Sequence, residues 1–72
     1  MEDMSFYKAL GPVLKDIRKK KKVTQKQVAN KLGVSKMMVS HWERGNRTIM
    51  AHQLVEYCGA LGVTVQSVFD RM

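Results

Sequence analysis

One short pattern occurs three times in this sequence: an apolar residue, a threonine or serine, three further residues and a second apolar residue. The three copies cover Val23–Val28, Val34–Val39 and Val63–Val68. A hydroxyl at this position accepts a hydrogen bond from an amide in the first turn of a helix, and the flanking apolar residues are spaced to contact each other. The pattern therefore predicts helices that begin at Thr24, Ser35 and Thr64.

Glycines mark where two of these helices end. The second helix is expected over about Gln25–Leu32 and the third over about Lys36–Arg44. Gly33 and Gly45 follow them directly, and glycine adopts the left-handed conformation that closes a helix without steric cost. A last short helix is expected over Val65–Asp70. No segment alternates apolar and polar residues as a half-buried strand does.

The first and fourth helices have less clearly marked ends. Apolar residues three and four apart predict the first helix: Leu10, Val13, Leu14 and Ile17. Pro12 suits its first turn, although Ser5 could cap an earlier turn, so one kinked helix and a turn followed by a helix both remain open. The fourth helix is expected over about Met50–Ala60, with Thr48 as the nearby cap candidate. The chain is thus predicted to be an all-α, compact five-helix bundle over residues 10–72, with residues 1–9 as an extension or extra helical turn.

Composition limits the partners and the compartment. Thirteen Lys and Arg against six Asp and Glu give a net charge of +7 over 72 residues, the length of one domain. This charge favours DNA, RNA or an acidic membrane face, and a merely soluble basic domain remains open.

Cys58 is the only cysteine, which excludes an internal disulfide, and with His41 and His52 it has no metal-ligand spacing. Neither a membrane span nor a signal peptide is recognisable, so a cytoplasmic location is expected.

Two short helices joined by Gly33 and Val34 form the most informative unit of the chain. The residues expected to pack between them are Val28, Leu32, Val34, Val39 and Trp42. Ala29 lies where the helices would cross and is small enough to let them approach closely. The third helix then exposes an acid-free face made of Lys36, Met37, Ser40, His41 and Arg44. A helix of this kind fits the major groove of DNA, where residues near its N-terminus reach base edges.

The stretch from Gln25 to Arg44 resembles the helix-turn-helix of the phage repressor and Cro family, also called the xenobiotic response element type. The family pattern T-Q-x-x-[LV]-A-x-x-[LV]-G-V-S-x-x-x-[IV]-S-x-[WY]-E-R-G is present as TQKQVANKLGVSKMMVSHWERG. Similarity covers about four-fifths of the chain, from Gly11 through L-K-D-I-R to L-G-V-T-V-Q-S-V-F. The fourth helix departs from the family, because Ile49 and Met50 stand where a proline and a serine are common.

The resemblance implies roles for individual residues. Positions that read base edges are occupied here by Lys36, Met37 and His41, with Ser40 as a candidate contributor. Positions that bind phosphates are occupied by Gln25, Ser35, Arg44, Asn46 and Arg47. Arg18 and Glu43 match an ion pair that ties the first helix to the third, and Glu43 is the only acid between Ile17 and Val55. The resemblance thus implies a non-enzymatic regulator of transcription that binds double-stranded DNA in a prokaryote or phage, associated with the nucleoid, without cofactor, metal or small-molecule ligand.

A homodimer on a two-fold symmetric DNA site is expected, because Val65, Phe69 and Met72 are apolar and lie where too little chain remains to cover them. The fourth and fifth helices would make this contact.

Repression by promoter occupancy is the default, and activation through polymerase contact remains open. The alternative is an antitoxin or another protein-interaction module of the same fold. Single-stranded RNA is disfavoured because few aromatic residues are available for stacking on bases.

Some residues have a plainer interpretation than a functional one. Trp42 is expected in the core rather than as a stacking platform, from its inward position. Met38 fits the edge of the core and the DNA face equally well. The basic run Arg18–Lys22 is interpreted as a solvated helix end that raises the local potential, with at most one phosphate contact. No acid pairs with a histidine at a spacing typical of catalysis.

Overall fold

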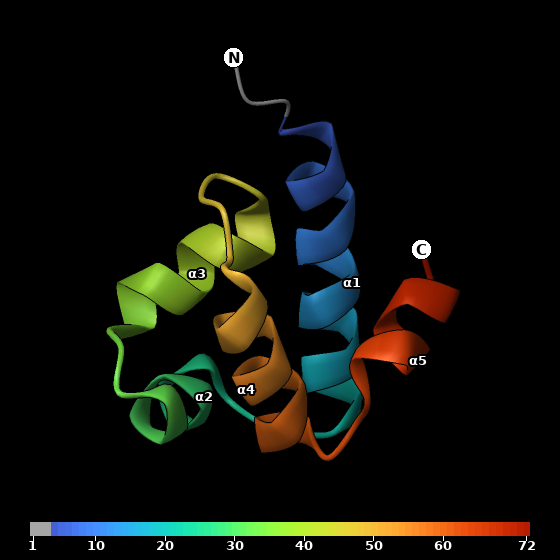
Figure 1. Cartoon of the computed structure of the whole chain (residues 1–72). Coiled ribbons are helices and arrows are strands. Elements are labelled where there is room, and N and C mark those ends of the chain that lie inside the picture. Colours follow the sequence, from blue (N-terminus) through green and yellow to red (C-terminus); the bar gives the residue numbers. More distant parts are fainter. Residues whose placement is uncertain (1–3) are drawn as a thin grey trace.

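The computed structural model describes residues 4–72, which form five helices and contain no strand (Figure 1). The helices are α1 (Ser5–Lys20), α2 (Gln25–Leu32), α3 (Lys36–Arg44), α4 (Ala51–Leu61) and α5 (Val65–Asp70). The predicted all-α, five-helix class is confirmed. Of the predicted extension over residues 1–9, residues 1–3 lie outside the described part, and residues 5–9 form the first turns of α1. Within residues 4–72, no helix is long and apolar enough to cross a membrane.

Hydrogen bonds confirm the three predicted helix starts. Each hydroxyl oxygen accepts from the backbone amide three residues later: Thr24 at 3.1 Å, Ser35 at 3.0 Å and Thr64 at 3.1 Å. The side chain of Gln27 accepts in return from the amide of Thr24 at 2.8 Å, which completes a capping box. A cap of this kind contributes about 1 kcal/mol, so the short helices depend on these local signals.

The structure resolves one open alternative and corrects one expectation about helix starts. Of the two alternatives for the first helix, the structure has one helix that begins at Ser5, so Pro12 lies in the interior of α1 rather than in its first turn. Half-buried Tyr7 packs against the core and adds an apolar contact to these first turns. Thr48 does not cap α4: the N-cap is Met50, whose amide donates to the side chain of Gln53 at 2.9 Å. This bond is the glutamine half of a capping box, and the methionine side chain itself makes no cap hydrogen bond.

Helix α1 runs through the centre of the molecule, with α2, α3 and α4 on one side and α5 on the other (Figure 1). The buried apolar core draws on all five helices and the segment before α4: Leu10, Leu14, Ile17, Val28, Ala29, Val39, Trp42, Ile49, Leu54, Tyr57, Cys58, Leu61 and Val68. Trp42 is buried, as predicted, and Leu32 and Val34 pack at the edge of this core. Met38 is also half-buried against it.

Gly11 allows α1 and α3 to cross closely. A Cβ atom at this position would lie 2.5 Å from the carbonyl oxygen of Trp42 and 2.6 Å from that of Glu43. Both neighbours are backbone atoms of a helix, so they cannot move aside as a flexible side chain can. Gly45 at the end of α3 is similarly confined, because a Cβ there would lie 2.6 Å from Cα of Lys8. These glycines fix α3 against α1.

Candidate nucleic-acid interface

A tight turn sets the angle between α2 and α3. Gly33 has φ +70°, and the amide of Val34 donates to the carbonyl oxygen of Ala29 at 3.0 Å. Ala29 is buried, which lets the two helices pack closely as expected from its size. The N-terminal part of α3 extends from this turn into solvent, and Met37 is 61% exposed. The turn therefore presents α3 at the surface rather than under another helix.

An open groove runs along the exposed side of α3. Its lining residues are Gln25, Lys36, Met37, Ser40 and Arg44, and we call it the recognition groove. The start of α2 contributes the amide of Gln25, and α3 contributes an ammonium, a guanidinium, a hydroxyl and a thioether. The groove thus combines hydrogen-bond donors with one apolar side chain and has no acid in its lining. This combination matches the polar edges of base pairs and the thymine methyl group.

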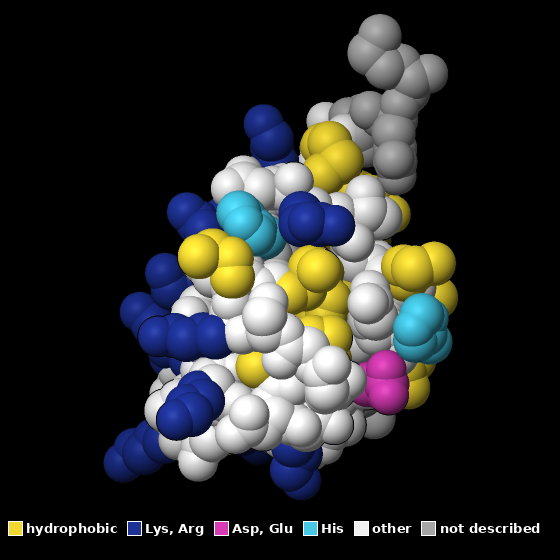
Figure 2. All heavy atoms as spheres, turned by 90° about the vertical axis from the view of Figure 1, so that its left-hand side faces the viewer, with side chains coloured by type: hydrophobic (Ala, Val, Ile, Leu, Met, Phe, Trp, Pro, Cys, Tyr) yellow, Lys and Arg dark blue, Asp and Glu magenta, His cyan; other side chains and the backbone are white. Residues whose placement is uncertain are grey.

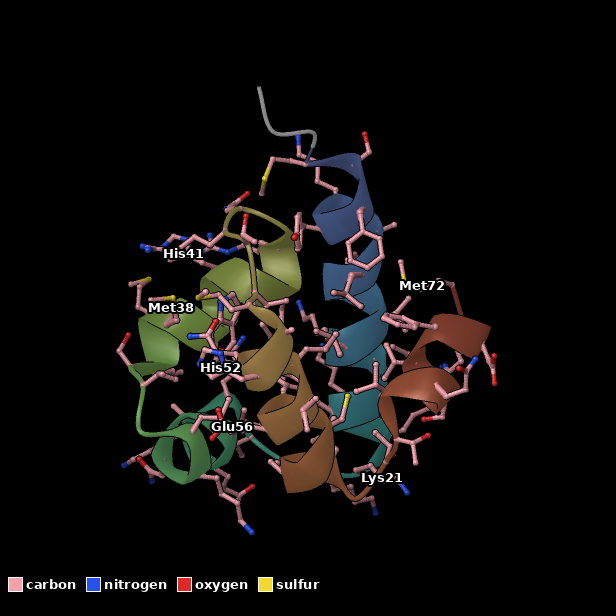
Figure 3. The ribbon with its side chains drawn as sticks, in the orientation of Figure 1. Lys21, Met38, His41, His52, Glu56 and Met72 are labelled. Atoms are coloured by element: carbon pink, nitrogen blue, oxygen red, sulfur yellow. The ribbon has the colours of Figure 1, made fainter. Side chains whose placement is uncertain are left out.

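The other sequence-predicted residues surround this groove. His41 is half-buried on the side of α3 away from α1 (Figure 3), and its Nδ1 atom is buried without a hydrogen-bond partner among residues 4–72. Asn46 and Arg47 are exposed in the segment between α3 and α4. The exposed Ser35 hydroxyl already accepts from Met38, but its own O–H can still donate. The structure therefore places the predicted contact residues along one side of α3 and at both of its ends.

Charge is distributed unevenly over the face that carries α2 and α3. Figure 2 shows most Lys and Arg side chains of this face along one edge and at its lower end, whereas the one acidic patch in view lies at the opposite edge. A second groove lies at the basic side, between the end of α1 and the starts of α2 and α3. A surface of this polarity attracts a polyanion along one side of the domain.

A buried network of hydrogen bonds lies beneath the recognition groove. Arg18 and Glu43 form an ion pair through two contacts, Nε to Oε2 at 2.6 Å and Nη2 to Oε1 at 3.0 Å. Tyr57 of α4 donates to Oε2 at 2.5 Å, and Nε2 of Gln25 donates to Oε1 at 2.9 Å. One carboxylate therefore joins four helices, and it holds the side chain of Gln25 at the rim of the recognition groove.

The network shifts the pKa values of its members. Burial alone would raise the pKa of Glu43, but hydrogen bonds from Arg18, Tyr57 and Gln25 outweigh it and the pKa is lowered. Burial and the hydrogen bond to this carboxylate raise the pKa of Tyr57. The hydrogen bond to Glu43 also raises the pKa of Arg18, against its own burial. All three groups therefore keep one protonation state near neutral pH, which suits a structural role.

Tyr57 was not identified from the sequence as part of this site. Its only sequence signal is an aromatic residue inside the fourth helix, which equally predicts an ordinary core position. The partner Glu43 lies fourteen residues away, beyond the range of any helical periodicity. The hydrogen bond from Gln25 to Glu43 was also not predicted, because the sequence position of Gln25 indicated only a phosphate contact. One N–H of the amide is used, and the other N–H can still donate to a phosphate.

Comparisons with known proteins agree with this architecture. Residues 14–68 match the helix-turn-helix family. The clp gene regulator ClgR from Corynebacterium glutamicum is 34% identical, with 89% of this chain and 82% of that chain covered and a TM-score of 0.85. The wild-type restriction-modification controller protein C.Esp1396I is 26% identical, with 97% and 91% covered and a TM-score of 0.84.

A further structure of C.Esp1396I shows that protein as a tetramer in complex with its natural 35 base-pair operator. It is 26% identical to this chain, with 97% and 91% of the two chains covered and a TM-score of 0.83. No curated protein sequence matches the chain. The family match spans most of the chain, from α1 to α5. Together with the structural similarity to ClgR, it shows that this protein belongs to the helix-turn-helix family of the Cro and phage repressor type.

Proposed function

We propose that this protein binds double-stranded DNA in a sequence-specific manner and represses transcription by occupying a promoter, acting on the nucleoid in the cytoplasm. The observation that carries the proposal is the recognition groove, an open and acid-free surface along α3 beside a tightly packed α2. An α-helix presented in this way fits the major groove. The similarity to C.Esp1396I, which was crystallised as a tetramer in complex with its operator, supports binding of duplex DNA.

Within this proposal, α3 supplies the contacts to bases. Lys36 at its start donates to guanine O6 or N7, and Met37 contacts a thymine methyl group. Ser40 and His41, about one and about one and a half turns further along α3, add hydrogen bonds to neighbouring bases or phosphates. These four side chains approach the duplex from one helix, so their spacing sets the register of the base pairs that they read.

The contacts to the sugar–phosphate backbone come from residues on both sides of α3. Gln25 and Ser35 lie at the starts of α2 and α3, where backbone amides also point outward and favour anions. Arg44, Asn46 and Arg47 lie at the other end, and all three are exposed. Contacts on both sides fix the orientation of the helix in the groove but carry no sequence information.

We also propose a homodimer that pairs two copies through their C-terminal helices. Phe69 is 41% exposed and Met72 is 47% exposed, and both lie on or beside α5 (Figure 3). The exposed ring of Phe6 in α1 contacts Phe69 edge-to-face, with centroids 6.2 Å apart, which extends the apolar surface. In such a dimer on a two-fold symmetric site, the two α3 helices would have to enter successive major grooves, which lie about 34 Å apart.

A salt titration with duplex DNA tests the proposed function. Fluorescence anisotropy of a labelled 30-base-pair random-sequence duplex would be measured at increasing salt, with the single strand of the same length as control. Each neutralised phosphate adds about −0.9 to the slope of log K against log salt, so a slope of about −2 to −4 per protomer is expected. Absence of duplex binding at low salt would contradict the proposal and favour a protein-interaction module.

A further inference from the structure

A second groove lies next to the recognition groove, at the end of α1. Its lining residues are Arg18, Lys19, Lys22, Val23, Thr24, Gln25, Lys26 and Lys36, and we call it the basic groove. Five of these side chains are cationic and none is acidic. It is formed where the C-terminal end of α1 meets the first turns of α2 and α3.

Most of the positive charge in the basic groove is not compensated within residues 4–72. The guanidinium of Arg18 is neutralised by Glu43, and it also donates to the carbonyl oxygen of Val23 at 2.8 Å. The four exposed lysines of the groove form no ion pair with the described acids: Lys19, Lys22, Lys26 and Lys36. Ammonium groups that share one groove repel each other, so an anion placed between them lowers the electrostatic energy.

Lys22 has a strained backbone conformation that glycine would adopt more easily. Lys22 has φ +59°, the only positive φ of a non-glycine residue within the described chain. Its amide donates to Lys19 and the amide of Val23 donates to Arg18, the same helix ending that Gly33, Gly45 and Gly62 form after α2, α3 and α4. A side chain in this conformation is less stable than glycine. The chain therefore has a charged lysine at a position where glycine would make the folded protein more stable.

The basic groove is continuous with the recognition groove, because Gln25 and Lys36 line both. A duplex seated on α3 would carry its backbone past these two residues and toward the end of α1. We propose that the basic groove binds the phosphodiester backbone of DNA beside the base-read segment, with Lys22 as a phosphate-binding residue. This inference rests on the proposed function and extends its contact surface from α3 to the end of α1.

The variant Lys22→Gly tests this inference, and Lys21→Ala is its matched control. Lys21 is adjacent and carries the same charge, but it lines a different groove with Ser67 and Arg71 near α5 (Figure 3). On a random-sequence duplex, the salt slope of Lys22→Gly is expected to be smaller by about 1, with affinity about three- to tenfold lower near 0.1 M salt. Lys21→Ala is expected to keep the wild-type slope.

Thermal unfolding separates this binding effect from a folding defect. Because glycine relieves the left-handed strain, Lys22→Gly is expected to raise the Tm by about 2–5 °C while it weakens DNA binding. Equal slopes for Lys22→Gly and the wild type, or an equal loss in both variants, would overturn the inference. Failure of the wild-type protein to bind any duplex would instead overturn the proposed function, so the two failures are distinguishable.

Discussion

The phenol oxygen of Tyr57 lies 2.5 Å from Oε2 of Glu43, so α4 is hydrogen-bonded to the carboxylate that pairs α1 with α3. The carboxylate has both oxygens occupied, since Oε1 accepts from Arg18 and from Gln25. A buried charge is tolerated when it is paired and hydrogen-bonded in this way. The same bonds orient α3 relative to the body of the domain, and thereby orient the surface proposed to enter the major groove.

Removal of the Glu43 charge is expected to destabilise the protein in a pH-dependent way. Because the pKa of Glu43 is lower in the folded protein than its usual value of 4.5, the carboxylate adds stability above about pH 4.5. That stability is lost as the pH falls through the folded-state pKa. Glu43→Gln should therefore cost about 3 kcal/mol near neutral pH and should flatten the decline of Tm on acidification.

Calorimetry between about pH 3 and pH 7 measures this effect. Glu56→Gln removes an exposed acid from α4 and serves as the control, which should keep a Tm close to that of the wild type at neutral pH. The role assigned to the network is wrong if Glu43→Gln keeps the wild-type Tm at neutral pH.

Two glycine-to-alanine substitutions should have opposite effects. Gly11→Ala places a Cβ 2.5 Å from a carbonyl oxygen of α3 and should cost at least about 2 kcal/mol through overpacking. Gly59 lies inside α4, and a Cβ there meets no atom within 4 Å. Gly59→Ala should therefore stabilise the helix by about 0.5–1 kcal/mol. Urea unfolding of both variants checks the prediction, and a Gly11→Ala variant at least as stable as the wild type would show that α1 and α3 do not cross as described.

Lys36 and Gln25 should contribute differently to DNA binding. Lys36→Ala removes a base contact and should reduce discrimination at one base pair by about tenfold. Gln25→Ala removes a phosphate contact and should weaken binding to all sequences by a similar factor. Selection of bound duplexes from a random pool, followed by affinity measurements on single-base variants, distinguishes the two. If both variants affect every sequence alike, the assigned roles are incorrect.

Phe69→Gln should weaken the proposed dimer without unfolding the domain. The ring is 41% exposed, so most of the loss is expected in the association of two copies rather than in the core. Sedimentation equilibrium should show a dissociation constant at least about tenfold higher than for the wild type, since loss of a buried aromatic anchor costs more than about 1.4 kcal/mol. Met37→Gln alters an exposed residue of α3 and should leave the dimer intact. A monomeric wild-type protein would contradict the proposed assembly.

Local sequence signals determined most of the helix boundaries. Thr24, Ser35 and Thr64 act on amides only three residues away, so their hydrogen bonds can be anticipated without knowledge of the fold. The glycines after α2 and α3 act equally locally, through the conformation of one residue. The exposed side of α3 was also predictable, because helical periodicity separates it from the buried side that carries Val39 and Trp42.

Tertiary structure alone decided the features that depend on distant residues. Pro12 lies inside α1 because the turns before it are already helical and pack through Tyr7, which apolar spacing from Leu10 onward did not reveal. Tyr57 and Glu43 meet only because α3 and α4 are folded against each other. The basic groove likewise requires three helix ends to converge. Caps and glycine stops act within a few residues, whereas buried hydrogen bonds and shared grooves exist only after the helices have packed.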